Sequence, residues 1–227
     1  MTKILPLIPE HKIFVDVFTG SGTVFFNKPL AETNIINDLD DYVYDFLKLI
    51  QEHGSVSSDR IFKTIDDIKE FYKSEPESIS DKLIYKKVLC STGYRGNKIR
   101  HIDMIYNNFN INNYLAGLDI YKELLRHATI TNLDFETVIN NYNTEDTFFY
   151  LDPPYEHSTI KFGYAEHKSF NYERFKTVID TIKGKFLISL NDSEYIRNLF
   201  KDYKIESIIV HDEIIHRDRK ELFIRNY

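Results

Sequence analysis

The tetrapeptide Asp152–Tyr155, which reads Asp-Pro-Pro-Tyr, constrains this chain more than any other stretch. It follows Phe148–Leu151, a run of four apolar residues that predicts a short strand buried on both faces. Strand pairing must stop at the prolines, because neither has a backbone N–H. A rigid turn would explain the prolines, but not the acid and the ring beside them. We therefore expect the tetrapeptide at the carboxyl end of a strand, where ligands bind in open α/β sheets.

A second ligand-binding pattern lies near the amino end. Ile13–Phe18 predicts a buried strand, Thr19–Gly22 (Thr-Gly-Ser-Gly, the glycine turn) follows it, and Thr23–Asn27 can open a helix. A strand, a glycine turn and a helix in this order let a ligand approach the backbone closely. The glycine turn lacks the third glycine of a dinucleotide fingerprint and the Gly-Lys-Ser/Thr of a P-loop, which disfavours NAD and ATP.

Asp38 ends the next predicted strand, Thr33–Asn37. It follows the glycine turn near the spacing at which an acid at the end of a second strand meets ribose hydroxyls. Asp38 could also be the N-cap of the amphipathic helix predicted over Asp41–Glu52. The spacing after the glycine turn favours the ribose role.

About ninety residues separate Asp38 from the next predicted strand, Ala128–Leu133, far more than a crossover connection needs. We therefore expect an insertion. It is mainly helical, because Asp59–Lys73 and Asp81–Cys90 both have helical patterns, and a helix over Ile111–His127 leads back to the sheet.

The predicted insertion contains a basic stretch. From Lys82 to His101 there is no acid, and the cations are Lys82, Lys86, Lys87, Arg95, Lys98 and Arg100. The whole chain has a net charge of −6, which argues against non-specific coating of nucleic acid. A solvated helix face and a surface that follows phosphates both explain the stretch, and the stretch alone does not decide between them.

The remaining pattern predicts how the sheet is completed. The expected elements are a short helix over Glu136–Asn141, a polar loop over Glu156–Asn171, a helix over Tyr172–Lys183 stopped by Gly184, a strand over Lys185–Leu190, a helix over Ser193–Lys201, and an antiparallel edge hairpin of Lys204–Val210 and Glu221–Arg225. The single Cys90 excludes an internal disulfide and a cysteine-rich zinc site. Short apolar stretches and the absence of a signal peptide predict a cytoplasmic protein without a membrane span.

The order of these motifs resembles the Dam-type (D12 class) DNA adenine-N6 methyltransferases. The resemblance runs from about Leu7 to the C-terminus and rests on Phe18–Gly22, Asp38 and the tetrapeptide. It implies an α/β fold, a Rossmann-like mixed seven-stranded methyltransferase sheet with helices on both faces. It also implies a catalytic domain of residues 1–56 and 114–227, with an inserted, mainly helical target-recognition region at 57–113.

The resemblance implies S-adenosylmethionine as methyl donor, adenine N6 in double-stranded DNA as acceptor, and no metal. The implied cofactor-binding residues are Phe18, Gly20, Gly22, Asp38, Asp134, Phe135 and Asp152. Asp152 and the Pro153 carbonyl are placed to accept the two N–H bonds of the target amine, and Tyr155 to stack on a flipped base. Within the insertion we expect DNA contacts from Tyr94, Arg95, Lys98 and Arg100. The default is a monomer of bacterial or phage origin, acting in DNA methylation and restriction–modification.

Two alternatives stay open. The acceptor could be cytosine N4, RNA or a protein amide, although relatives with those acceptors more often begin the tetrapeptide with Ser or Asn, so Asp152 favours adenine. The chain could instead be a catalytically impaired DNA-binding member. The family normally begins with a lysine- and glycine-containing cofactor segment, and Lys3 is not in a matching context.

Overall fold

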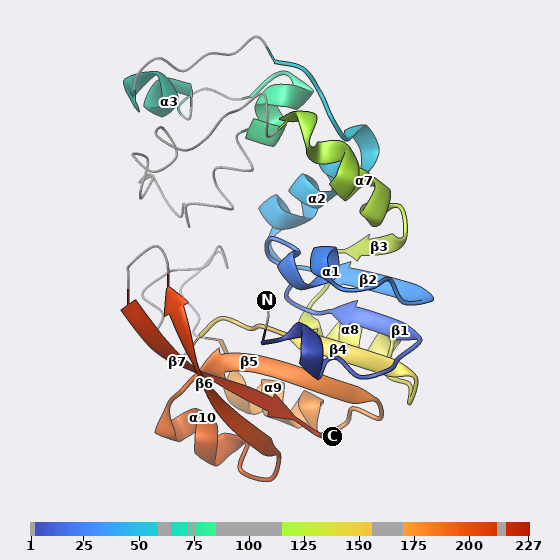
Figure 1. Ribbon diagram of the computed structural model, residues 1–227, viewed down its shortest axis with the longest axis vertical. Coiled ribbons are helices and arrows are strands. Elements are labelled where there is room, and N and C mark those ends of the chain that lie inside the picture. Colours follow the sequence, from blue (N-terminus) through green and yellow to red (C-terminus); the bar gives the residue numbers. More distant parts are fainter. Residues whose placement is uncertain are drawn as a thin grey trace. The chain divides into compact units, whose positions relative to one another are not determined.

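The computed structural model describes residues 3–58, 65–71, 73, 76–84, 115–155, 170–212 and 217–227 (Figure 1). The chain divides into two compact units. The first comprises Met1–Leu39 and Thr131–Tyr227, and the second comprises Asp40–Ile130. The predicted domain boundaries and the predicted recognition role of residues 57–113 stay predictions.

The sheet has seven strands in the order β3-β2-β1-β4-β5-β7-β6. The strands are β1 (Ile13–Asp16), β2 (Thr33–Asn37), β3 (Ala128–Thr131), β4 (Thr147–Leu151), β5 (Lys185–Asn191), β6 (Lys204–Asp212) and β7 (Arg217–Arg225). β1 pairs in parallel with β2 and β4, and β4 pairs in parallel with β5. β7 is antiparallel to both β5 and β6. The predicted mixed sheet and C-terminal hairpin are therefore confirmed, with β6 outermost.

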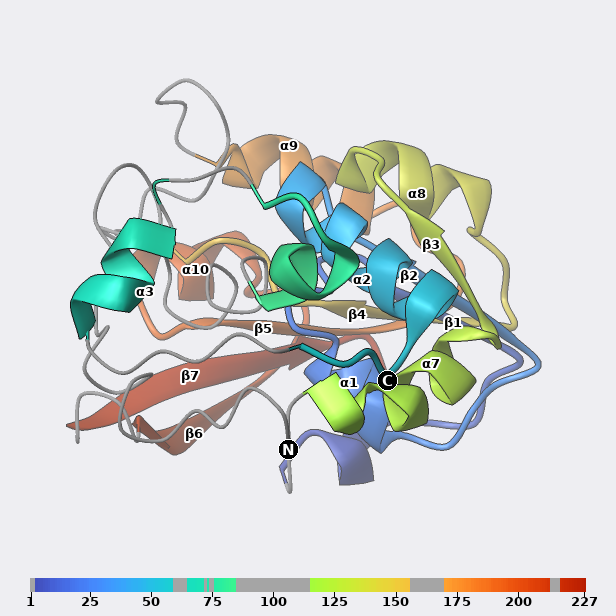
Figure 2. The ribbon, with the colours of Figure 1, turned by 90° about the horizontal axis from the view of Figure 1, so that it is seen from above.

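Helices cover both faces of the sheet in the first unit. They are the 3-10 helix η1 (Leu5–Leu7) and the α-helices α1 (Thr23–Asn27), α8 (Phe135–Asn141), α9 (Tyr172–Ile179) and α10 (Glu194–Leu199). Figure 2 shows α8 and α9 on one face and α1 on the other. Polar caps fix three of the helix starts, because Asp134, Asn171 and Ser193 each accept a hydrogen bond from a backbone N–H in the first turn.

The second unit is largely helical where it is described. It contains α2 (Asp41–His53), α3 (Ile65–Phe71), α7 (Leu118–Leu125) and a further helical stretch at residues 79–84. α2 buries Phe46, Leu47 and Ile50 along one face, as its periodicity predicts. Lys122 of α7 donates to the Glu52 carbonyl of α2 at 3.0 Å. Among the described residues, no helix combines the length and apolar character needed to cross a bilayer.

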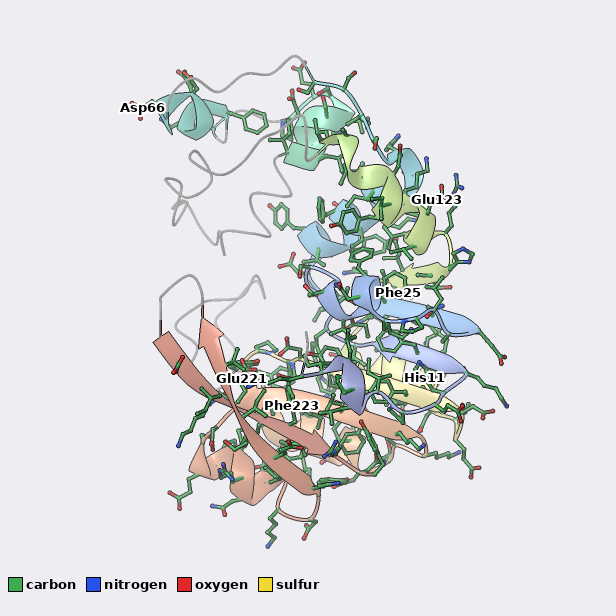
Figure 3. The ribbon with its side chains drawn as sticks, in the orientation of Figure 1. His11, Phe25, Asp66, Glu123, Glu221 and Phe223 are labelled. Carbon is green, nitrogen blue, oxygen red and sulfur yellow. The ribbon has the colours of Figure 1, made fainter. Side chains whose placement is uncertain are left out.

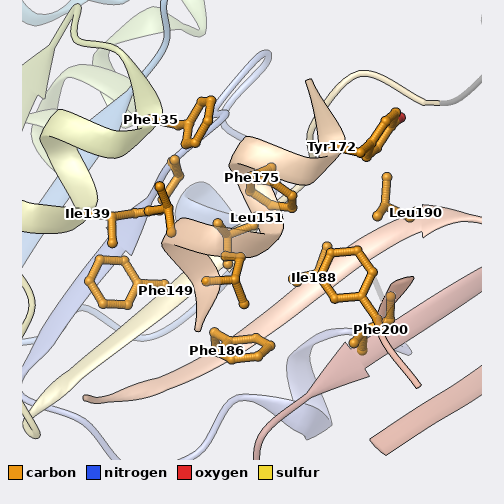
Figure 4. Close-up of a cluster of buried hydrophobic side chains, with 14 of the residues drawn as sticks. Phe135, Ile139, Phe149, Leu151, Tyr172, Phe175, Phe186, Ile188, Leu190 and Phe200 are labelled. Carbon is orange, nitrogen blue, oxygen red and sulfur yellow. The ribbon is translucent and has the colours of Figure 1, made fainter. Parts of the chain in front are cut away.

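The core of the first unit is an apolar cluster between the sheet and helices α8, α9 and α10 (Figure 4). Aromatic rings supply much of its volume, because Phe149, Phe175, Phe186 and Phe200 are all fully buried within it. The tetrapeptide is attached to this core directly, since Leu151 at the end of β4 belongs to the cluster. The core therefore anchors the segment that carries the expected chemistry.

The other face of the same strands carries both buried apolar side chains, such as Phe14 and Phe148, and four buried polar ones. Side chains alternate between the two faces along a strand. The apolar cluster takes Val15 from β1 and Val17 just after it, Phe149 and Leu151 from β4, Ile188 and Leu190 from β5, and Leu222 and Ile224 from β7. Asp16, Tyr150, Ser189 and Glu221 lie between or beside these residues and so face the opposite way. These four residues, the polar row, are each at most 6% exposed.

The helix predicted over Tyr172–Lys183 is shorter than expected. The observed helix, α9, ends at Ile179. The next N–H groups bond three residues back instead of four, with Thr181 bonded to Val178 and Ile182 to Ile179. The Thr181 hydroxyl also donates to the Val178 carbonyl at 2.7 Å. This side chain competes with the helix for a backbone acceptor, so the helix stops before Gly184.

Gly184 instead lies against the turn that precedes β4. A Cβ atom there would lie 2.2 Å from the Thr147 carbonyl oxygen and 2.6 Å from that of Thr144. The φ angle of Gly184 is not positive, so this clash alone opposes substitution.

We expect Gly184→Ala to lower the free energy of unfolding by about 1–3 kcal/mol, measured by urea denaturation. The exposed neighbour Lys183→Ala serves as control, and equal unfolding midpoints for the two variants would contradict the predicted clash.

Candidate active site

The buried side chain of Asn37 brings three loops together at one edge of the sheet. Its Nδ2 donates to the carbonyls of Val17 at 3.0 Å and Leu133 at 2.9 Å. Its Oδ1 accepts from the Thr131 hydroxyl at 2.8 Å and from the Leu133 N–H at 2.9 Å. The Asn37 backbone carbonyl also accepts from the Thr19 N–H at 2.8 Å. The segments after β1, β2 and β3 are therefore fixed to one another through this residue.

The glycine turn places Asp38 beside the first residues after β1. Gly20 and Gly22 have positive φ angles of 52° and 72°, a conformation that favours glycine. The Gly20 N–H donates to Oδ2 of Asp38 at 2.8 Å. A Cβ at Gly20 would meet nothing within 4 Å, whereas one at Gly22 would lie 2.5 Å from the Phe26 ring. The space at Gly20 is open, and Gly22 is needed for packing as well as for its backbone angle.

The structure decides between the two interpretations of the position after β2. The N-cap of α2 is Asp40, whose side chain accepts from the Tyr42 N–H. The N-cap interpretation of Asp38 is therefore wrong, because Asp38 faces the glycine turn instead. Its ribose-binding role stays a prediction.

The tetrapeptide is held in place by hydrogen bonds at two of its residues. Asp152 is exposed at the end of β4, while Pro153 is buried. The Tyr172 hydroxyl, at the start of α9, donates to the Pro154 carbonyl. The Tyr155 hydroxyl donates to Oε1 of Glu221 at 3.2 Å and lies 3.3 Å from the Ser189 hydroxyl. The tetrapeptide is therefore joined to α9, β5 and β7 as well as to β4.

The glycine turn and the tetrapeptide follow adjacent parallel strands. Asp16 is in register with Tyr150, and the Val17 N–H donates to the Tyr150 carbonyl at 3.0 Å. The loops after β1 and β4 therefore begin side by side, as expected for the carboxyl edge of a parallel sheet.

Acidic side chains converge beneath this edge. Burial raises the pKa of Asp16 well above its ordinary value, and the nearby charges of Asp152 and Asp38 raise it further. Oδ1 of Asp16 has no hydrogen-bond partner within the described part of the chain. Burial also raises the pKa of Tyr150, with Asp152 as the next cause. A neutral or cationic donor placed here would meet an acceptor already withdrawn from water.

Lys28 is a buried cation that interacts electrostatically with Asp16. Burial lowers its pKa to about 8, although Asp16 acts in the opposite direction. Its ammonium group lies 4.2 Å from the centroid of the Phe14 ring and donates to Asn34 at 3.2 Å. Lys28 is therefore held on the β1–β2 side of the polar face.

An aromatic group flanks the glycine turn on the apolar side. The ring of Phe18 lies 6.1 Å from Phe135, 5.9 Å from Phe170 and 6.0 Å from Phe175, measured between centroids. The contacts to Phe170 and Phe175 are edge-on, a favourable geometry for aromatic pairs. Phe18 and Phe135, both expected to bind cofactor, are thus brought together, with Phe170 beside them.

Asp134 has a partner that the sequence did not indicate. Its carboxylate accepts from both terminal nitrogens of Arg174 and caps α8 at the Glu136 N–H. The Arg174 guanidinium also pairs with Glu136 and lies 4.6 Å from the Phe135 ring centroid. Asp134 therefore stands beside Phe135, as expected, but a ligand that uses its carboxylate must share it with Arg174.

Several structural contributors were missed from sequence. They are Asn37, Tyr172, Arg174, Ser189 and Glu221, described above. Ser189 interrupts an apolar strand run, which is the signal that could have marked it, whereas Glu221 follows four charged residues and has no such signal. The expected DNA contacts Tyr94, Arg95, Lys98 and Arg100 lie outside the described residues, as do Cys90 and residues 156–169 of the predicted polar loop. Among the described residues, no group of three or more His, Cys, Asp or Glu side chains could hold a metal ion.

The glycine turn, Asp38 and the tetrapeptide occur in one recognised order along the chain. The model of the D12 class N6 adenine-specific DNA methyltransferases matches residues 1–216. The chain belongs to this family. The family expected from the resemblance is thereby confirmed, as the strand order already confirmed the seven-stranded sheet.

Three proteins similar to this chain are named as methyltransferases or methylases. The type II methyltransferase M.CviBI of Paramecium bursaria Chlorella virus NC1A is 24% identical over 243 residues, covering 94% of this chain and 89% of that protein. The modification methylase StsI of Streptococcus sanguinis is 25% identical, covering 89% of this chain and 37% of that protein. The DNA N-6-adenine-methyltransferase of Escherichia phage P1 is 22% identical, covering 92% of this chain and 30% of that protein. The chain therefore spans well under half of the latter two proteins.

Solved structures give only distant likenesses. The putative methyltransferase yhhF from Escherichia coli is 12% identical with a TM-score of 0.40, covering 100% of this chain and 83% of that one. The putative methyltransferase SMU.1697c from Streptococcus mutans, solved in complex with SAH, is 11% identical with a TM-score of 0.39, covering 98% and 94%. Likenesses of this size carry no functional information.

The Asn37 cross-link makes a direct prediction about stability. We expect Asn37→Ala to lower the free energy of unfolding by about 2–4 kcal/mol, because several buried backbone groups lose their partners together. Urea denaturation measures this loss. Asn140→Ala, on the exposed side of α8, is the matched control and should change stability by less than about 0.5 kcal/mol. An Asn37→Ala loss no larger than that of the control would contradict the cross-link.

The raised pKa of Asp16 predicts a pH dependence. Because the folded protein favours the protonated carboxyl, its stabilising contribution is fully present below the ordinary pKa of 3.8 and is lost as pH rises through the folded-state value. Asp16→Asn stays neutral throughout. Its stability relative to wild type should therefore increase as pH rises from about 4 to about 8, in urea titrations. Asp202→Asn, an exposed acid, is the control, and parallel pH curves for Asp16→Asn and wild type would refute the assignment.

Proposed function

We propose that this protein transfers a methyl group from S-adenosylmethionine to the N6 amine of adenine in double-stranded DNA, after the target base has flipped out of the duplex. The observation that carries the proposal is the tetrapeptide at the end of β4, directly beside the glycine turn that follows β1. A donor site and an acceptor site on adjacent strand ends are what direct transfer between two bound substrates requires.

The donor site is formed by the glycine turn and its neighbours. S-adenosylmethionine supplies a methyl group on a positively charged sulfur, open to attack by an amine. Its proposed contacts are Phe18, Gly20 and Gly22 for the methionine part, Asp38 for the ribose hydroxyls, Asp134 and Phe135 for the adenine ring, and Asp152 near the methyl group. No metal enters this assignment.

The residues at this edge fit such a ligand in two respects. The open space at Gly20 allows close approach to the backbone, next to a carboxylate that the Gly20 N–H orients. The buried carboxyl of Asp16, whose Oδ1 is unsatisfied within the described part of the chain, offers a ligand a further polar group on the same edge. Binding at Asp134 requires the carboxylate to be shared with Arg174 or released by it.

The acceptor site is the tetrapeptide itself. The lone pair of the adenine amine is delocalised into the ring, which makes the amine a poor nucleophile. The Asp152 carboxylate and the Pro153 carbonyl accept its two N–H bonds, pull the nitrogen towards tetrahedral geometry and free the lone pair. We assign the Pro153 carbonyl because that of Pro154 already accepts from Tyr172. Tyr155 stacks on the flipped base.

The DNA itself is proposed to be bound through the region of residues 57–113. Tyr94, Arg95, Lys98 and Arg100 are the expected contacts there, with Arg95 pairing with guanine or meeting a phosphate. A monomer acting in the cytoplasm of a bacterium or of a phage-infected cell is the simplest setting.

The variant Asp152→Asn separates the chemical step from cofactor binding. It keeps the shape of the side chain but weakens the acceptor for the amine, so we expect methyl incorporation into unmethylated duplex DNA to fall by about 100-fold or more. Binding of S-adenosylmethionine, measured by calorimetry, should weaken by less than about tenfold. Asp202→Asn, which changes the same residue type at an exposed turn, should match wild type in both measurements.

The companion variant Asp38→Asn should impair cofactor binding more than the chemical step, the reverse of Asp152→Asn. Loss of the ribose contact is expected to weaken cofactor binding by about tenfold, with methyl transfer largely restored at saturating cofactor. Full activity in Asp152→Asn would contradict the proposed acceptor site. A wild-type protein that binds no S-adenosylmethionine would instead favour a DNA-binding member without activity, and labelled cytosine or RNA would favour another acceptor.

A further inference from the structure

The Tyr155 hydroxyl makes a part-buried polar contact that methyl transfer, as described above, does not require. It donates to Oε1 of Glu221 at 3.2 Å and lies 3.3 Å from the Ser189 hydroxyl. Ser189 is on β5 and Glu221 on β7, so the contact joins the tetrapeptide to two further strands. Both residues belong to the polar row, which faces away from the apolar cluster.

Glu221 is an unexpected residue at this place in the sheet. β7 lies between β5 and β6, and the residues that follow Glu221 on it, Leu222, Phe223 and Ile224, are all buried and apolar. Figure 3 labels Glu221 beside Phe223 on this strand. A carboxylate taken out of water lowers stability unless hydrogen bonds compensate for its lost hydration. The strand itself would be served better by an apolar residue, so a role outside folding is indicated.

The partner of Glu221 suggests what that role is. A tyrosine ring next to a strand end can adopt several rotamers, and a hydrogen bond at its far end selects among them. The other contact of the tetrapeptide, from Tyr172 to the Pro154 carbonyl, fixes the backbone just before the ring. With both contacts made, the backbone and the tip of Tyr155 are fixed.

We propose that Glu221, supported by Ser189, is a positioning residue that fixes the Tyr155 ring in the orientation needed to stack on the target base. The inference rests on the proposed function, because it needs a base to stack on Tyr155. Glu221 itself touches neither the base nor the methyl donor in this scheme. Its contribution is to keep the ring ready before the base arrives, which lowers the cost of ordering at the moment of reaction.

A double-mutant cycle tests the link between the two residues. The variants are Tyr155→Phe, Glu221→Ala and the double variant, assayed for methyl transfer to unmethylated duplex DNA at saturating S-adenosylmethionine. Each single variant should lower kcat by about tenfold, and the double variant should be no worse than the singles, because both remove one interaction. The KM for S-adenosylmethionine should stay within about twofold of wild type, since the donor site is untouched.

The conservative variant Glu221→Gln separates positioning from charge. Its amide oxygen can still accept from the Tyr155 hydroxyl, so kcat should return to within about threefold of wild type. Glu206→Ala, on the neighbouring strand β6, removes an exposed glutamate and should leave kcat unchanged. Urea denaturation of the same cycle provides a readout without turnover, in which the Tyr155 and Glu221 substitutions should also be non-additive.

The outcomes distinguish this inference from the function on which it rests. A wild-type protein that forms no N6-methyladenine overturns the proposed function and the inference together. An active wild type whose single losses multiply in the double variant overturns the positioning role alone. So does a Glu221→Gln variant as slow as Glu221→Ala, because the carboxylate charge would then be the active feature.

Discussion

The four hydrogen bonds of the Asn37 side chain are the constraint on which the rest of the active edge depends. A primary amide has two donors and two acceptor positions, and here all are used within one buried position. The carbonyl of Val17 and both backbone groups of Leu133 thereby take their places relative to β2. The glycine turn begins two residues after Val17, and Asp134 follows Leu133, so Asn37 fixes where both segments start relative to β2. Asp38, the next residue along, is oriented by the same arrangement through the Gly20 N–H.

The two faces of the central strands differ in the side chains that they carry. One face packs aromatic and aliphatic side chains against α8, α9 and α10 and supplies the stability of the unit. The other carries the polar row alongside buried apolar residues such as Phe14 and Phe148, and burial there disfavours the charged form of Asp16. Buried polar residues that do not serve the core are expected mainly at functional sites. The tetrapeptide joins both faces, because Leu151 enters the core while Tyr155 reaches Glu221.

Local patterns were enough to predict most of the sheet. The apolar runs predicted β1, β2, β4 and β5, and the spacing after the glycine turn drew attention to Asp38, which the structure places beside that turn. The contacts that complete the site lie beyond such patterns. Asn37 joins Leu133 across 96 positions of sequence, and Tyr155 joins Glu221 across 66. Which polar side chains meet at those separations depends on strand order and register, which emerge only when the sheet forms. The early end of α9 has a local cause, the Thr181 hydroxyl, but the periodicity of the helix masks it.

In the proposed function, the glycine turn, Asp38 and the tetrapeptide act as one site that methylates adenine at N6. The most direct measurement is mass spectrometry of nucleosides from duplex DNA incubated with the purified protein and S-adenosylmethionine that carries a deuterated methyl group. We expect the label in N6-methyldeoxyadenosine and in no other nucleoside. Label in N4-methyldeoxycytidine, or unlabelled DNA from a protein that binds the donor, would contradict it.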